Sequence, residues 1–110
     1  MAATRSLLRQ IQARVRTRDY HFTLHAEDRI IQRYISVREV EDALLSKEAE
    51  VIEDYPEDPR GSSCLILGFT LDGRPLHIQS TYPPDISIIT AYEPESEGWI
   101  DWRVRKGGEP

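Results

Sequence analysis

The sequence predicts an α+β fold in which two to three N-terminal helices pack on one face of a four- to five-stranded, mainly antiparallel sheet. Hydrophobic residues recur at helical spacing through residue 47, and after residue 50 the spacing changes to two or to short apolar runs. We expect one domain, because the chain has 110 residues, of which 39% are hydrophobic and 30% are charged.

The first predicted helix covers residues 3–18 and has two distinct faces. Its core-facing stripe, which lies within about 100° of the helical wheel, consists of Leu7, Leu8, Ile11 and Val15. Three arginines, Arg5, Arg9 and Arg16, cluster within about 40° on a separate face. Residues 19–22 are expected to turn the chain.

The second predicted helix covers residues 24–34. Its apolar arc consists of Leu24, Ala26, Ile30, Ile31 and Tyr34. On the other side, His25, Arg29 and Arg33 stand at i, i+4 and i+8 and form one ridge, called the His-Arg ridge below.

A third helix is predicted to open at Ser36 and to end near Lys47. Glu39 follows Ser36 by three residues, which is the pattern of a capping box. The expected core stripe of this helix consists of Val37, Val40, Ala43 and Leu44.

The second half of the chain predicts a meander of strands. Four strands are expected over residues 50–55, 64–70, 74–81 and 86–92, and residues 99–104 are expected to add an edge strand. Asp72-Gly73 predicts a type I′ turn between the second and third of them.

The formal net charge of −5 argues at first against a nucleic-acid partner, but the charge is segregated. Residues 1–38 carry eight arginines against three acids, for a net +5. Residues 39–101 have a net charge of −12, and residues 102–110 have a net charge of +2. Because screening limits electrostatic influence to about 10 Å at ordinary salt, a phosphate meets the basic ends rather than the average.

Other classes of protein are disfavoured by the composition. No apolar run approaches the ~20 residues that span a bilayer, so we expect no membrane partner. Arginines interrupt the apolar residues at the N-terminus, so we expect no signal peptide. Cys64 is the only cysteine, which excludes a disulfide framework. A cytoplasmic protein of bacterial type is the simplest interpretation.

The His-Arg ridge is the most suggestive candidate site. Two guanidinium groups can hold a phosphate while a nearby imidazole moves a proton, and metal-free RNA cleavage requires a base, an acid and cations. The alternative is structural: Arg29 and Arg33 pair with Glu27, Asp28 or acids of the sheet, and His25 caps the helix.

His77 is a second candidate, in the predicted strand 74–81. Period-two geometry places Thr90 and Tyr92 with Ile86 and Ile88, so His77 shares a face with Thr90 or Tyr92 only if the register permits it. The alternative is a hydrogen-bonded structural histidine.

Aromatic and histidine side chains offer two further kinds of site. Tyr92, Trp99 and Trp102 offer rings for base stacking, with completion of the core as the alternative. A metal site built on His21, His25 and His77 is disfavoured, because no carboxylate stands at a diagnostic spacing. We expect no metal and no cofactor.

Five segments carry a resemblance to a known family. They are HAxxRxxxRxIS from His25, EDYP from Glu53, CLILG from Cys64, DGRPLH from Asp72 and ITAYEP from Ile89. Together they resemble a bacterial domain-of-unknown-function family, number four-two-five-eight, over about residues 20–103. The layout is similar to that of RelE/BrnT/MqsR-type toxins, which are typically metal-independent ribonucleases held inactive by an antitoxin.

This resemblance implies a RelE-like domain over residues 20–105, with an Arg-rich helix before it at residues 1–19 and a tail after it at residues 106–110. The implied catalytic residues are His25, Arg29, Arg33, His77 and Tyr92. With Arg103 from the basic C-terminal segment, the substrate-binding candidates are Arg29, Arg33 and Thr90. A small zinc-finger-type antitoxin is the implied protein partner, and the oligomeric state is left open.

We therefore expect a toxin-type, metal-independent endoribonuclease that acts on RNA. The alternative from another class is a non-catalytic protein-interaction or regulatory module of the same fold, which uses the Arg-rich first helix or a sheet edge to bind its partner.

Overall fold

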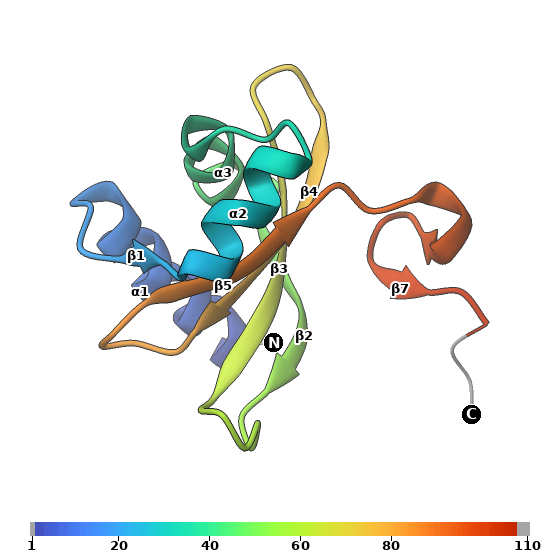
Figure 1. Cartoon of the computed structure of the whole chain (residues 1–110). Coiled ribbons are helices and arrows are strands. Elements are labelled where there is room, and N and C mark those ends of the chain that lie inside the picture. The colour runs from blue at the N-terminus through green and yellow to red at the C-terminus, as the bar shows by residue number, and fades with distance from the viewer. Residues whose placement is uncertain (1, 108–110) are drawn as a thin grey trace.

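The computed structural model describes residues 2–107, and Figure 1 shows three helices gathered on one side of a twisted sheet. The helices are α1 (Ala2–Arg16), α2 (Leu24–Gln32) and α3 (Val37–Leu44). The main sheet consists of β1 (His21–Phe22), β2 (Glu50–Tyr55), β3 (Ser63–Phe69), β4 (Pro75–Thr81) and β5 (Ser87–Tyr92). The predicted α+β class, with N-terminal helices on a mainly antiparallel sheet, is confirmed. No helix within residues 2–107 is long and apolar enough to cross a membrane.

The strands of the main sheet lie in the order β1-β5-β4-β3-β2. All neighbours are antiparallel except β1, which pairs in parallel with Ser87 and Ile88 of β5. The prediction that residues 19–22 only turn the chain was therefore wrong at His21 and Phe22. A strand of two residues has no period of its own, and only its pairing with β5 defines it.

Two β-bulges change which side chains face the helices. In β5, Gln79 lies opposite Thr90 while Ser80 lies opposite Ile88, so Ile89 is an extra residue. In β2, Ile52 is extra in the same way, because its neighbours Val51 and Glu53 face consecutive residues of β3. Each bulge shifts the alternation by one residue, so the side chains beyond it exchange faces of the sheet.

The main core lies between the helices and one face of the sheet. Leu7, Ile11 and Val15 of α1 are buried there, as the predicted stripe requires, and so are Val40, Ala43 and Leu44 of α3. In α2, only Ala26 and Ile30 of the predicted arc are buried. Leu24, Ile31 and Tyr34 are 79%, 71% and 88% exposed, and Val37 is also exposed, so their assignment to the core was wrong. The nine-residue α2 lies on β5 through a narrow face, which leaves its outer side to solvent.

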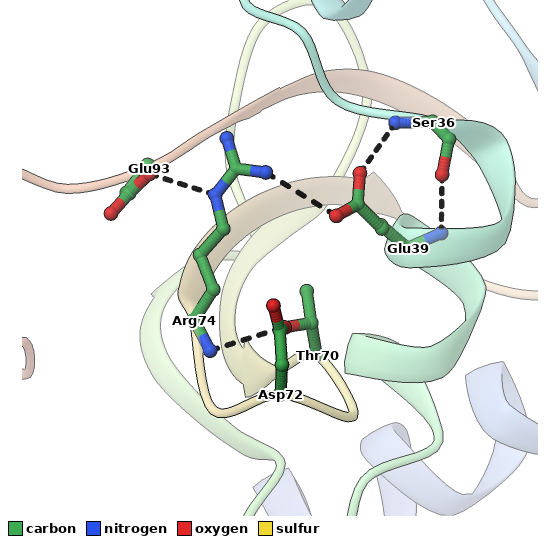
Figure 2. A network of polar contacts seen from close by, with 6 residues as sticks. All are labelled: Ser36, Glu39, Thr70, Asp72, Arg74 and Glu93. Atoms are coloured by element: carbon green, nitrogen blue, oxygen red, sulfur yellow. Dashed lines mark hydrogen bonds and ion pairs between the residues drawn. The ribbon is translucent and has the colours of Figure 1, made fainter.

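The capping box predicted at the start of α3 is present. The Ser36 Oγ accepts a hydrogen bond from the Glu39 backbone N–H at 3.0 Å, and Glu39 Oε1 accepts one from the Ser36 N–H at 2.9 Å. The other carboxylate oxygen of Glu39 pairs with Arg74 at 3.3 Å, and Arg74 also pairs with Glu93 at 2.8 Å (Figure 2). Arg74 therefore ties the first turn of α3 to the β3–β4 turn and to the end of β5.

The β3–β4 connection differs from the predicted type I′ turn. Of Asp72 and Gly73, only Gly73 has a positive φ, of 87°. The Gly73 N–H donates to the Thr70 carbonyl, and the Thr70 N–H donates to the Arg74 carbonyl, both at 2.9 Å. This is a type I turn closed by glycine in the left-handed region, because Asp72 avoids the positive φ that a type I′ turn demands.

The predicted edge strand over residues 99–104 was wrong, because the chain there forms a hairpin of its own. A short 3₁₀ turn, η1 (Ser96–Gly98), leads into β6 (Trp99–Ile100), which pairs with β7 (Val104–Arg105). Asp101 and Trp102 turn the chain with φ of 53° and 64°. This C-terminal hairpin (Trp99–Arg105) contacts the face of the sheet that the helices leave free. Of the predicted tail, residues 108–110 lie outside the described residues.

Candidate functional site

The His-Arg ridge lies along the exposed side of α2. Thr23 caps the helix by accepting a hydrogen bond from the Ala26 N–H at 3.0 Å, so His25 falls in the first turn. Arg33 stands at the other end as the C-cap residue. All three ridge side chains are exposed. At 1.5 Å rise per residue, His25 and Arg33 are separated by about 12 Å along the helix axis.

Arg33 joins the ridge to the end of β5. Its Nη1 donates to the Ala91 carbonyl at 2.9 Å and to the Thr90 Oγ1 at 3.4 Å. Its guanidinium carbon lies 5.9 Å from the centre of the Tyr92 ring, within the range of a cation–π contact. Three predicted site residues, Arg33, Thr90 and Tyr92, therefore come together at one sheet edge.

The bulge at Ile89 also brings Tyr92 beside His77. Simple alternation places Thr90 and Tyr92 on the core face with Ile88, but the register sets Thr90 opposite Gln79 and Tyr92 opposite His77. The Tyr92 and His77 rings meet edge to face, with their centres 5.3 Å apart. The register question that the sequence left open is thus answered by one extra residue in β5.

His77 is fully buried, and both of its ring nitrogens are hydrogen-bonded. Nε2 lies 2.7 Å from the Trp102 carbonyl oxygen, and Nδ1 lies 3.3 Å from the Tyr92 hydroxyl. Because a carbonyl only accepts, Nε2 carries the proton, and the neutral ring accepts from Tyr92 at Nδ1. Burial lowers the pKa of His77, although the Trp102 carbonyl and the charge of Glu53 oppose this. The imidazole is therefore neutral at pH 7, and the half-buried Tyr92 is its hydrogen-bond partner at Nδ1.

Tyr92 lies between the buried histidine and the exposed ridge. Its side chain is half-buried, and burial raises the pKa of its phenol above the ordinary value, so the hydroxyl keeps its proton at neutral pH. The proton can be donated to the Nδ1 of His77, and the Arg33 guanidinium lies over the ring. Tyr92 is thus the one predicted residue that touches both parts of the candidate site.

Sequence reasoning missed a second group of residues that surrounds His77. Glu53 lies on this face because of the bulge at Ile52, and it pairs with Arg105 at 2.9 Å while accepting a hydrogen bond from Tyr55. Burial would raise the pKa of Glu53, but the hydrogen bonds from Arg105 and Tyr55 outweigh it and hold the pKa below its usual value. Trp99 packs edge to face on His77 at 4.3 Å, with the Arg105 guanidinium 4.7 Å above its ring. Glu53 and Tyr55 belong to the EDYP segment, which was the available signal.

Other predicted residues are not brought to His77 and Tyr92. His25 makes no polar contact with another described site residue, and Arg29 donates only to the Gln32 side chain at 3.5 Å. Arg103 lies at the other edge of the sheet, where it pairs with Glu50 of β2 at 2.8 Å and with Asp101 at 2.9 Å. It borders a cavity of about 480 Å³ between α1 and β2 rather than the ridge.

Ion pairing divides the arginines into two groups. Within residues 2–107, all five arginines after Ile35 pair with a carboxylate, namely Arg38, Arg60, Arg74, Arg103 and Arg105. Of the seven before Ile35, only Arg14 does, with Asp19. The structural alternative in which Arg29 and Arg33 pair with Glu27, Asp28 or sheet acids is not what the structure shows. The ridge keeps its positive charge unneutralised.

The structure offers no ready metal centre in the part of the chain that it describes. No group of three or more His, Cys, Asp and Glu side chains there is arranged to hold an ion. His21, one of the three histidines considered as metal ligands, is hydrogen-bonded to the Ser87 hydroxyl at 2.8 Å, where β1 pairs with β5.

Comparison with known proteins gives one match. The model of a family described as "Domain of unknown function (DUF4258)" matches residues 22–93. Neither a curated protein nor a solved structure matches the chain. The matched range includes the ridge, His77, Thr90 and Tyr92, whereas α1 and the C-terminal hairpin lie outside it.

Proposed function

The chain belongs to the DUF4258 family, whose description names no activity, and we propose that it is a toxin-type, metal-independent endoribonuclease. In such a reaction the 2′-hydroxyl of RNA attacks the adjacent phosphorus, the bond to the 5′-oxygen breaks, and a 2′,3′-cyclic phosphate forms. The step needs a group that removes the 2′-hydroxyl proton, a group that protonates the leaving oxygen, and cations that bind the phosphate. The proposal places the protein in the cytoplasm.

One observation carries the proposal, namely the unneutralised charge of Arg29 and Arg33. Both side chains are exposed on one side of α2, and within residues 2–107 neither forms an ion pair. An arginine that already binds a carboxylate must give up that partner to bind phosphate, whereas these two need not. The net charge of −5 does not oppose this, because charges beyond about 8–10 Å are largely screened at ordinary salt.

The proposal gives each candidate residue a role that fits its position. Arg29 and Arg33 hold the scissile phosphate, and Thr90 orients Arg33 through its hydroxyl. His25, the exposed imidazole of the ridge, removes the 2′-hydroxyl proton and, as the imidazolium, returns it to the leaving 5′-oxygen. Tyr92 orients the substrate or stacks on a base beside Arg33. His77 acts behind Tyr92, because its buried ring contacts the Tyr92 hydroxyl and is covered by the C-terminal hairpin.

The test combines toxicity on expression with cleavage of RNA by the purified protein, with and without ribosomes and in the presence of EDTA. We expect growth arrest and cleavage that EDTA leaves intact, with cyclic phosphate ends. His25→Ala and Arg29→Ala are each expected to lower the cleavage rate by about 10²-fold or more, the usual scale for loss of an acid–base group or a phosphate contact.

The matched control is Arg60→Ala. Arg60 is also an exposed arginine, but it pairs with Asp58 in the loop after β2, so its loss should leave cleavage at the parent rate. The proposal is wrong if the parent leaves RNA intact under all conditions and its expression is harmless. It is wrong about His25 if the His25→Ala protein cleaves as fast as the parent.

A second candidate function, a non-catalytic protein-interaction module, is favoured by exposed apolar side chains in α2 and in the segment that leads into α3. Leu24, Ile31, Tyr34 and Val37 are large, apolar and exposed, and they lie within fourteen residues of the chain. Exposed apolar side chains gathered on one surface are typical of protein contacts. The partner implied by the toxin resemblance is a small zinc-finger-type antitoxin.

These two functions can be separated by isolating the protein with its partner. A stable complex that yields no ribonuclease activity after the partner is removed would favour the interaction module. A neighbouring gene that encodes a short antitoxin-like protein would favour the ribonuclease.

A further inference from the structure

A row of three arginines on α1 has no role in the site described above. Arg5, Arg9 and Arg16 are exposed and lie within about 40° around the helix. With 1.5 Å rise per residue, the row is about 16 Å long. Helix α1 contains no acidic residue, so nothing within the helix offsets this charge.

No ion pair joins the row to any other residue that the structure describes. Within residues 2–107, Arg14 is the α1 arginine that finds a carboxylate, and it points elsewhere, to Asp19 and the Pro84 carbonyl. The arginines after Ile35 do find carboxylate partners, so the row is not unpaired for want of acidic residues in the chain. The α1 row therefore presents three positive charges to whatever binds it.

The surroundings of the row indicate the chemistry of its partner. An in-plane membrane helix needs an exposed apolar face, but Leu7, Ile11 and Val15 of α1 are buried in the core. A protein interface has an apolar centre, yet the eight large hydrophobic side chains that are exposed within residues 3–107 all lie outside α1. Ser6 and Ala13 are exposed beside the row, and Arg5 also borders the cavity between α1 and β2, where charges of both signs gather on Lys47, Glu48, Glu50 and Arg103. Charged and polar contacts without an apolar centre are typical of binding to a nucleic-acid backbone.

We propose that Arg5, Arg9 and Arg16 form a second RNA-binding surface, which contacts backbone phosphates independently of base sequence. The choice of RNA over other polyanions rests on the proposed function, because the α2 ridge would hold the scissile phosphate of the same strand. Helices α1, α2 and α3 lie on the same face of the sheet (Figure 1). Helix α1 packs against β2, α2 against β5, and α3 against β3 and β4 between them. The row adds affinity and salt dependence, and the ridge carries the chemistry.

The experiment measures how RNA binding depends on salt. The probe is a fluorescein-labelled, single-stranded RNA of about 20 nucleotides with 2′-O-methyl riboses, which lacks the nucleophile for cleavage and so reports binding alone. Its anisotropy is measured with the full-length chain from 25 to 200 mM salt. Each phosphate contact on a single strand contributes about 0.7 to the slope of log K against log salt. Arg5→Gln/Arg9→Gln should therefore reduce the slope by about 1.4.

The matched control is Arg38→Gln/Arg60→Gln, which removes the same charge from exposed arginines that already have carboxylate partners. It should leave the slope within about 0.3 of the parent, because those charges are neutralised within the protein. Equal slopes for the two double variants would overturn the proposal. The proposal would also be overturned if Arg5→Gln/Arg9→Gln lowered the salt slope of binding to poly-glutamate or to phosphatidylserine vesicles more than that of binding to RNA.

Cleavage of unmodified RNA is measured in parallel, so that the two proposals can fail separately. A parent protein that binds through the row but never cleaves would refute the ribonuclease and leave the second surface standing. If the parent cleaves RNA, and the Arg5→Gln/Arg9→Gln protein has the same slope of log K against log salt as the parent, only the proposal of the second surface is refuted.

Discussion

At the scale of single residues, Tyr34 is held in an unfavourable backbone conformation without any gain in burial. It has a φ of 58° and is 88% exposed, directly after the C-cap of α2. The Ile35 N–H reaches back to the Ile30 carbonyl at 2.9 Å, which completes a Schellman-type end and buries Ile35. Glycine is the usual residue here, because a Cβ is disfavoured in the left-handed region. The strain is thus kept at a position whose side chain is exposed and adds nothing to the core.

Tyr34→Gly is expected to raise the free energy of unfolding by about 1 kcal/mol, since it removes the left-handed penalty of a residue with a Cβ. Chemical denaturation monitored by circular dichroism measures the change. Tyr34→Ala is the control, because it removes the ring but keeps the Cβ, and it should bring no such gain. A Gly variant no more stable than the Ala variant would contradict this account.

At the scale of elements, Gly68 sets the distance at which α3 packs on the sheet. A Cβ on this β3 residue would lie 2.1 Å from the Ala43 carbonyl oxygen and 2.6 Å from its carbon. These are backbone atoms of α3, so no side chain can rotate away to make room. The contact requires glycine because two backbones meet there, not because of its φ.

Gly68→Ala should destabilise the protein by about 1–3 kcal/mol or more, because α3 must move away from β3 and β4 to admit the methyl group. Gly98→Ala is the matched control. A Cβ at Gly98 meets nothing within 4 Å, and its φ is not positive, so the change should stay within about 0.5 kcal/mol. Thermal or chemical denaturation of both variants decides the matter, and equal stability of the two would show that α3 is not held by this contact.

At the scale of the whole molecule, the sheet has a core on each of its faces. The helices cover one face, and the C-terminal hairpin closes the other over Leu65, Leu67 and His77. The contact between the hairpin and the sheet depends on the charge and protonation of its residues. Arg105 pairs with Glu53 and Arg103 pairs with Glu50, while His77 donates a hydrogen bond to the Trp102 carbonyl.

The free energy of unfolding should therefore fall as the pH falls below about 6.5. The pKa of His77 is lowered in the folded protein, so as the pH falls the unfolded chain takes up the proton first. The stability that is present above the pKa of the unfolded state is therefore lost as the pH drops through the pKa of the folded state. The lowered pKa of Glu53 has the same sign and adds a further loss in its own, more acidic range. Urea denaturation at pH 7, 6 and 5 measures the slope.

His77→Gln should flatten this slope between pH 7 and 5, although the variant is less stable than the parent at pH 7. His25→Gln, which removes an exposed imidazole, is the matched control and should keep the slope of the parent. A His77→Gln protein with an unchanged slope would show that the buried ring is not responsible.

Much of the fold was readable from local patterns. The stripe of α1, the capping box of Ser36 and Glu39 and the strand 50–55 all follow from the spacing of neighbouring residues, and each is present. The errors fall where distant segments decide the outcome. Residues 21 and 22 form a strand only because β5 lies beside them, and residues 99–104 fold back on the sheet instead of extending it. The exposed apolar side chains of α2 violate the pattern that predicts burial.

The candidate site divides along the same line. Helical spacing alone is enough to align His25, Arg29 and Arg33, because residues four apart on a helix share a side. Only the folded chain shows that a bulge at Ile89 turns Thr90 and Tyr92 toward His77, and that the C-terminal hairpin buries this histidine in its neutral form. It also shows that Arg29 and Arg33 have no carboxylate partner among the described residues, whereas the later arginines have one. Local geometry depends on neighbours in sequence, whereas burial, register and ion pairing depend on residues that meet only in the tertiary structure.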